Sequence, residues 1–465
     1  MQAKKKYMPM WIWIIVWLFI LGTLFNFVWP FLSQAKNPVF YVKADGLYVL
    51  PEGKEKSFKI ADSIDENDVQ QSPNGKKACF LDDNQNLYIR DIAENKENKF
   101  IDENVFSYTL INNNEIVYLK NEQMWLYDGK ENKELDSNVN SFDVSNDTKK
   151  VIYIKNDGNY YIIGLQNGDA PEQYTIDSGA NVISNKGEYK KFVFIEGNNV
   201  YLKEDGKEIV TIAENVDSAF VLGKSFYYFK GNDNEKVLYK LGKKGEEEVS
   251  NVIENELTSW SGKGIALLQS KNDEVYVLRE GQVPYLTVNL QNVITRPQIS
   301  NDGKNLYVLT NNGIENQSNL VKYKIGNDKL YGEKKVLENA EIYTYWLNNN
   351  KIFISTGTAE QQGLGVYKSG KYKEITKSGY LLGDLKNGIY YIDESGAETT
   401  LNKYYMGSVK KIDTQIVNYG FFGENLFYTK NQDLYWSKND KSKKIDTGVE
   451  HFVFPSGLPQ FPLSI

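Results

Sequence analysis

The chain has 465 residues, of which 25% are charged and 14% aromatic, so it carries the large apolar side chains that a disordered chain lacks. The formal net charge of -7 is spread along the sequence without a basic face, which argues against a nucleic-acid partner. A single cysteine, Cys79, and a single histidine, His451, exclude an internal disulfide and a Cys/His zinc cluster.

The first element in chain order is an apolar segment without a charged residue between Lys6 and Lys36. We predict a cytoplasmic N-terminus at 1–7, a transmembrane signal-anchor helix at 8–32 and a short linker at 33–37. The stretch 11–29 covers roughly 28 Å as a helix, close to the thickness of a bilayer core. Tryptophans that favour the headgroup boundary lie in this segment, and the anchor residues are Trp11, Trp13, Trp17 and Trp29.

Three lysines precede the helix, which predicts a cytoplasmic N-terminus and an extracellular remainder. A cleavable signal peptide, cut after Ala35, is the alternative, although the apolar run is longer than the usual signal-peptide core. Both interpretations place the rest of the chain outside the cytoplasm, in a bacterial cell envelope. The membrane is thus one expected partner.

Residues 38–457 repeat one pattern: an apolar strand, a polar turn, an aromatic-rich strand, a hairpin with Asn, Asp or Gly, and a strand with Tyr. Asn-Asp and Asp-Gly pairs tolerate the positive φ of a tight turn, and the flanking Val, Ile and Tyr suit a pleated surface. Helical periodicity is nearly absent, so the array is all-β. First strands are expected to begin near Val69, Phe106, Phe142, Val182, Ala219, Leu257, Arg296, Tyr343, Tyr380, Tyr419 and His451.

These starts are about 32 to 47 residues apart, which is the spacing of four-stranded propeller blades. We therefore predict a β-propeller of about eleven blades, arranged as one large ring or as two interlinked rings. The domain opens with the second and third strands of a unit and closes, at His451, with a first strand. The last strand is thus expected to complete the first blade, leaving 458–465 as a C-terminal tail.

Three turns carry a further signal. Each opens with serine and is followed by an apolar strand: Ser72-Pro73-Asn74-Gly75-Lys76, Ser145-Asn146-Asp147-Thr148-Lys149 and Ser300-Asn301-Asp302-Gly303-Lys304. They resemble the repeat of TolB-type propellers, in which such a turn joins the innermost blade strand to the second. The proline is kept only in the first copy and the glycine is replaced by Thr148. The resemblance implies a fold and a structural role for these turn residues, not a function.

No residue pattern predicts a catalytic, cofactor or metal site. His451 has no nucleophile motif near it, and Cys79 is expected to pack as a small hydrophobe. The acidic run 62–68 lacks the ligand spacing of a calcium loop, and Glu246-Glu247-Glu248 is expected to be a solvated turn. The tyrosine pairs 160–161, 227–228, 390–391 and 404–405, and Trp125, Trp260, Trp346 and Trp436, are expected to serve mainly blade packing.

The sequence therefore predicts a non-catalytic, membrane-anchored extracellular propeller, without a cofactor, that binds or scaffolds a protein, peptide or cell-envelope glycan. The alternative is a propeller-type hydrolase that acts on envelope glycans through carboxylates in a central channel.

Overall fold

The computed structural model describes residues 37–454, apart from short gaps at 63, 65–68, 95, 146, 166–171, 178–180, 185–190, 205–206, 233–234, 243–244, 251–254, 262, 271–273, 290–296, 349–350, 359 and 439–440. The predicted N-terminus, anchor helix and C-terminal tail lie outside these residues. Within the part that the structure describes, no helix is long and apolar enough to cross a bilayer.

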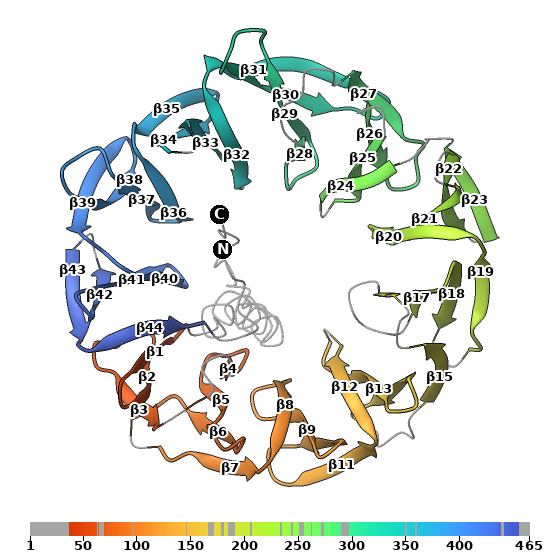
Figure 1. Ribbon diagram of the computed structural model, residues 1–465, viewed down its shortest axis with the longest axis vertical. Coiled ribbons are helices and arrows are strands. Elements are labelled where there is room, and N and C mark those ends of the chain that lie inside the picture. Colours follow the sequence, from red (N-terminus) through yellow and green to blue (C-terminus); the bar gives the residue numbers. More distant parts are fainter. Residues whose placement is uncertain are drawn as a thin grey trace, which may run out of the picture. The chain divides into compact units, whose positions relative to one another are not determined.

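The described residues form eleven four-stranded antiparallel sheets, which is the blade architecture predicted from the repeat (Figure 1). In ten sheets the strands are neighbours in chain order, from the first strand of the blade to the fourth. The exception joins β3 (Phe58–Ala61), β2 (Gly46–Leu50) and β1 (Val39–Lys43) to β44 (Val449–Val453). The all-β, eleven-blade expectation is confirmed.

The chain divides into two compact units: the described residues of unit 1 lie within 37–135, 417–438 and 443–454, and those of unit 2 within 136–416 and 439–442. Unit 1 holds four sheets from both ends of the described chain. Their strands are β1 (Val39–Lys43), β2 (Gly46–Leu50), β3 (Phe58–Ala61) and β44 (Val449–Val453); β4 (Val69–Gln71), β5 (Lys77–Leu81), β6 (Leu87–Asp91) and β7 (Lys99–Asp102); β8 (Val105–Leu110), β9 (Ile116–Lys120), β10 (Gln123–Tyr127) and β11 (Asn132–Ser137); and β40 (Tyr419–Phe422), β41 (Asn425–Lys430), β42 (Asp433–Lys438) and β43 (Lys441–Asp446).

Unit 2 holds the other seven sheets of the described residues. The first four contain β12 (Val139–Val144), β13 (Lys150–Lys155), β14 (Asn159–Gly164) and β15 (Glu172–Asp177); β16 (Asn181–Ser184), β17 (Lys191–Glu196), β18 (Asn199–Glu204) and β19 (Val210–Ala213); β20 (Val216–Leu222), β21 (Ser225–Asn232), β22 (Glu235–Gly242) and β23 (Gly245–Ser250); and β24 (Asn255–Ser261), β25 (Ile265–Ser270), β26 (Glu274–Arg279) and β27 (Tyr285–Asn289). The last three contain β28 (Gln298–Ile299), β29 (Asn305–Asn311), β30 (Ser318–Ile325) and β31 (Leu330–Ala340); β32 (Ile342–Asn348), β33 (Lys351–Gly357), β34 (Gln362–Lys368) and β35 (Lys371–Thr376); and β36 (Gly379–Leu385), β37 (Gly388–Asp393), β38 (Thr400–Tyr405) and β39 (Ser408–Thr414).

The second strand of a blade can pack against a neighbouring blade on each face, as β21 shows within unit 2. In β21 the side chains of Tyr227 and Tyr228 point to opposite faces, and both are buried. Tyr227 packs with Ala266 and Leu268 of the following blade, whereas Tyr228 packs with Val193 of the preceding one. Both members of this tyrosine pair are thus core residues, in line with the packing role expected for at least half of the paired tyrosines.

The first and last strands of the described chain close one sheet. β1 pairs antiparallel with β44, with Phe40 opposite Val453 and Tyr41 opposite Phe452. Val453 packs into one hydrophobic cluster of unit 1, and Val449 and Phe452 pack into another. The expected closure of the first blade by the C-terminal strand is therefore present.

The three serine turns share one hydrogen-bond pattern. In the first, Ser72 Oγ donates to Asn74 Oδ1 at 2.8 Å and accepts from the Lys77 backbone N–H at 3.0 Å. Ser145 and Ser300 do the same with Asp147 and Asp302 and with the backbone N–H five residues on. The serine side chain thereby caps the backbone N–H at or beside the start of the second strand in these three blades.

The residue before the lysine of these turns has positive φ: 63° at Gly75, 69° at Gly303 and 56° at Thr148. A β-branched residue is strained there by about 1–2 kcal/mol. We therefore expect Thr148→Gly to raise the free energy of unfolding by about 1 kcal/mol. Chemical denaturation of the full chain in detergent measures it, and Gly303→Thr is the matched reverse change. A loss of stability in Thr148→Gly would contradict this explanation of the turn.

Candidate functional site

A repeated cluster of Tyr, Lys and Asp ties neighbouring blades together. In unit 1, Tyr118 and Lys120 of β9 donate hydrogen bonds to Asp102 at the end of β7, Tyr118 Oη at 2.9 Å. Tyr41 and Lys43 of β1 donate in the same way to Asp446 of β43. Tyr153 and Lys155 of β13 donate in the same way to Asp136, the residue of β11 with which unit 2 begins. We call each of these three groups a clamp.

Burial and hydrogen bonding set the protonation of each clamp. Burial opposes ionisation of Asp102, but the hydrogen bonds from Lys120 and Tyr118 outweigh it and lower the pKa of the carboxyl. Burial and the hydrogen bond to Asp102 raise the pKa of Tyr118. The carboxylate therefore stays ionised and the phenol neutral, which suits a fixed charged hydrogen bond rather than proton transfer.

The first strands of five blades carry a β-bulge at the same place. In β8 the pairing with β9 shifts between Val105 and Ser107, so Phe106 is the extra residue that has no partner in the ladder. Four further strands show the same shift within the described residues. The five extra residues, which we call the bulge residues, are Phe106, Asn140, Asp217, Tyr343 and Glu450.

The residues around each bulge are alike, whereas the bulge residue itself varies. The preceding residue is a buried Val or Ile, and in four of the five strands the following one is Ser or Thr. In the fifth strand, β44, the following residue is His451, so the histidine occupies a structural position next to the bulge residue Glu450. All five bulge residues are exposed, Phe106 at 72% and Tyr343 at 47%. Bulges commonly re-aim a side chain beside a binding site.

The clamps hold the strands that carry the bulges. Val105, just before the first bulge, lies opposite the clamp lysine Lys120 in the β8–β9 ladder. Val139 lies opposite Lys155, and Val449 lies opposite Lys43, both also clamp lysines. Each clamp thus fixes the ladder position from which a bulge residue projects.

The sequence prediction missed a clamp-like contact within one blade of unit 2. Glu246, expected in a solvated turn, accepts hydrogen bonds from Tyr228 Oη at 3.0 Å and from Lys230 at 2.9 Å. Lys230 in turn lies opposite Val216, which precedes the bulge residue Asp217. The carboxylate of Asp217 lies 2.8 Å from Lys236 Nζ.

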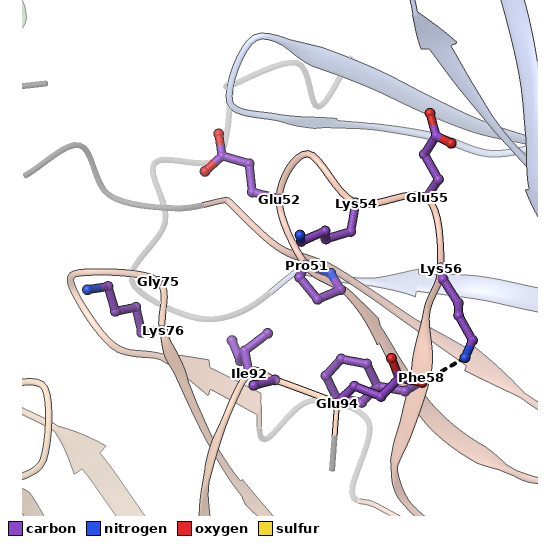
Figure 2. Close-up of a pocket in the computed structure, with 11 residues that line it drawn as sticks. Pro51, Glu52, Lys54, Glu55, Lys56, Phe58, Gly75, Lys76, Ile92 and Glu94 are labelled. Carbon is purple, nitrogen blue, oxygen red and sulfur yellow. Dashed lines mark hydrogen bonds and ion pairs between the residues drawn. The ribbon is translucent and has the colours of Figure 1, made fainter. Parts of the chain in front are cut away.

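A cavity of about 430 Å³ lies between the first two blades of unit 1 (Figure 2). Its walls come from the β2–β3 loop, the β4–β5 turn and the β6–β7 loop. Pro51, Phe58 and Ile92 provide its apolar surface, and Figure 2 shows them among the charged side chains of the loops. The volume is in the range of pockets that hold small molecules. A second cavity, of about 550 Å³, lies between the second and third blades of unit 2, beside Lys224 and Phe226.

The charges of the first cavity are only partly paired. Lys56 Nζ lies 2.7 Å from Glu94 across the two blades, and Lys443 pairs with Glu55. The side-chain amines of Lys54 and Lys76 have no ion-pair partner among the described residues. The cavity therefore presents the solvent-exposed ammonium groups of Lys54 and Lys76 together with its apolar surface.

The residues singled out from the sequence lie mostly in the scaffold. Cys79 is fully buried in β5, and burial raises the pKa of its thiol, so it is unreactive. Trp125 and Trp346 pack against hydrophobic clusters and Trp436 is buried. Of the acidic run, Asp62 is exposed and Ile64 buried, and most of the remainder lies outside the described residues. No three His, Cys, Asp or Glu side chains gather as a metal site in the described part of the chain.

No protein-family model matches the chain, and no curated protein matches its sequence. Among solved structures, a eukaryotic initiation factor is 12% identical, with a TM-score of 0.43 over 73% of this chain and 96% of that one. The propeller domain of the Trilobed protease from Pyrococcus furiosus is 15% identical, with a TM-score of 0.25 over 67% and 97%. AztD from Citrobacter koseri is 9% identical, with a TM-score of 0.32 over 73% and 94%. The propeller assignment rests on the sheets of this chain.

Proposed function

We propose that this chain is a non-catalytic binding module, held by its N-terminal helix on the outer face of a cell membrane, that recognises an envelope protein, peptide or glycan. The observation that carries the proposal is the recurrence, within each unit, of an exposed bulge residue near the start of a first strand. The neighbours of these residues in each strand recur because the fold requires them, while the bulge residues vary in size, charge and aromaticity. A position that the fold leaves variable and exposed, on a rigid strand, is available for recognition.

The chemistry of these positions supports binding. Phe106 and Tyr343 offer ring surface, which makes large contacts at a low cost in side-chain entropy. Asn140 and the carboxylates Asp217 and Glu450 can add hydrogen bonds. Such a set suits a partner that presents both apolar and polar groups.

The hydrolase alternative needs a carboxylic acid that keeps its proton at neutral pH, and so a raised pKa. The clamp carboxyls Asp102, Asp136 and Asp446 have lowered pKa values, because hydrogen bonds from Tyr and Lys outweigh their burial. They are committed to holding blades together. No observation in the described residues favours hydrolysis over binding.

The proposal predicts that Phe106→Ala combined with Tyr343→Ala weakens partner binding by about 30-fold, which corresponds to about 2 kcal/mol for aromatic anchors. Stability should change by less than about 1 kcal/mol, because both side chains are exposed. In-cell crosslinking followed by mass spectrometry of the full chain measures partner recovery. Phe100→Ala combined with Tyr331→Ala is the matched control, since these aromatics are similarly exposed on fourth strands, at 52% and 51%. Equal recovery from both variants would refute recognition by the bulge residues.

A further inference from the structure

The first described residue fixes one end of unit 1 relative to the predicted anchor. The Asn37 backbone N–H donates to Glu52 Oε2 at 3.3 Å, in the β2–β3 loop. A Cβ added at Gly423, in the β40–β41 turn, would lie 2.7 Å from Asn37 Nδ2. Asn37 therefore lies against two loops of unit 1, at the end of the blades where β1 begins.

The same end of unit 1 carries the first cavity. Glu52, which holds Asn37, is also a wall of that cavity, together with the Gly75–Lys76 turn before β5 (Figure 2). The Asn74 backbone N–H bonds the Asn113 side chain at 3.3 Å, which adds the β8–β9 loop to the same end. We call these loops, with the β40–β41 turn, the near face of unit 1.

The opposite end, which we call the far face, holds the turns that follow the second strands. β5 runs from Lys77 at the near face to Leu81, and Asp83 follows at the far face. The first strands run in the opposite direction to the second strands, so β8 and β44 begin at the far face. The bulge residues Phe106 and Glu450 lie at those beginnings.

The short linker between the predicted helix and Asn37 keeps the near face close to the bilayer. The predicted helix ends at residue 32, and five residues of extended chain span at most about 18 Å. We infer that the near face of unit 1 lies against the lipid headgroup layer and that its far face, with Phe106 and Glu450, points away from the membrane. This inference rests on the anchor of the proposed function.

The orientation has two consequences. The cavity with Lys54 and Lys76 opens toward the headgroups, so ligands reach it from the membrane side. The two bulge residues of unit 1 face the outside, where an envelope partner can reach them. The anchor and the recognition residues thus occupy opposite ends of the same blades.

The test uses the full chain in liposomes that contain a lipid with a spin-labelled headgroup. A fluorophore is attached to one introduced cysteine, since native Cys79 is fully buried and does not label. Lys76→Cys and Asp83→Cys form a matched pair, because both positions are exposed and they flank strand β5. They are separated by roughly 23 Å along the strand. Glu424→Cys, beside Gly423, gives a second near-face position.

We expect the labels at positions 76 and 424 to be quenched at least several-fold more than the label at position 83. Equal quenching at all positions, or stronger quenching at position 83, would overturn the orientation. Flotation of the same liposomes separates this result from a failure of the anchor. If the chain does not float with the lipid, the proposed membrane attachment is wrong, and the orientation falls with it.

Discussion

Removal of β44 is expected to unfold the first blade of unit 1, the largest effect that the structure predicts for a short deletion. A chain that ends after Thr447 loses Val449, Phe452 and Val453, which are buried in two clusters of unit 1. Burial of each such side chain contributes about 1.5–3 kcal/mol, so the loss should reach about 5 kcal/mol. The edge of β1 would also lose its hydrogen-bond partner.

Hydrogen exchange followed by mass spectrometry measures this effect on peptides that cover 39–43. Their amides should exchange much faster in the chain that ends after Thr447 than in the full chain. A chain that ends after Phe454 is the control, because it keeps β44 and removes only the residues beyond it. Slow exchange of β1 in the shorter chain would show that the C-terminal strand does not close the blade.

Asp102→Ala should destabilise unit 1 by about 2–4 kcal/mol. The side chains of Asp102 and Lys120 are only 17% and 21% exposed, so the substitution leaves a partly buried ammonium and the Tyr118 hydroxyl without their acceptor. Leaving a partly buried ammonium and a hydroxyl without an acceptor costs more free energy than the intact hydrogen bonds contribute to stability. Because Lys120 lies opposite Val105, the bulge at Phe106 should also lose its fixed position.

Chemical denaturation of the full chain in detergent gives the change in the free energy of unfolding. Asp83→Ala is the matched control: it also removes a carboxylate from the blade that contains Asp102, but at an exposed turn, and should change stability by less than about 0.5 kcal/mol. If the two variants lost the same stability, the clamp would not hold the blades together.

The blade pattern could be predicted because its causes are local. Strand alternation and turn residues act over a few positions, so the expected first-strand starts lie within three residues of the observed ones, as at Phe142 for β12, which begins at Val139. The closure of the first blade followed from the order of strands at the two ends of the repeat. Strand alternation predicted that at least one member of pair 227–228 is buried, and burial of the other depends on the blade at the opposite face.

The bulges and clamps are pairwise features, which explains why they were not predicted. A bulge exists only in the register between two strands, and a clamp joins residues of different blades. A local signal was nevertheless present: Asn104-Val105-Phe106-Ser107 and Asn138-Val139-Asn140-Ser141 share one pattern. In both, the asparagine has positive φ, 55° and 58°, which turns the chain into the bulged strand. The first cavity had no such signal, because its walls come from three separate loops of two blades.

The central claim is that the bulge residues contact a partner outside the cell. Site-specific photo-crosslinking in intact cells tests it directly, with a photoreactive phenylalanine analogue placed at position 106 or 343 of the full chain. Positions 100 and 331, which are also exposed but lie on fourth strands, are the controls. We expect a discrete crosslinked product from positions 106 and 343 that is absent from positions 100 and 331. No product from either bulge position, or the same products from all four, would contradict it.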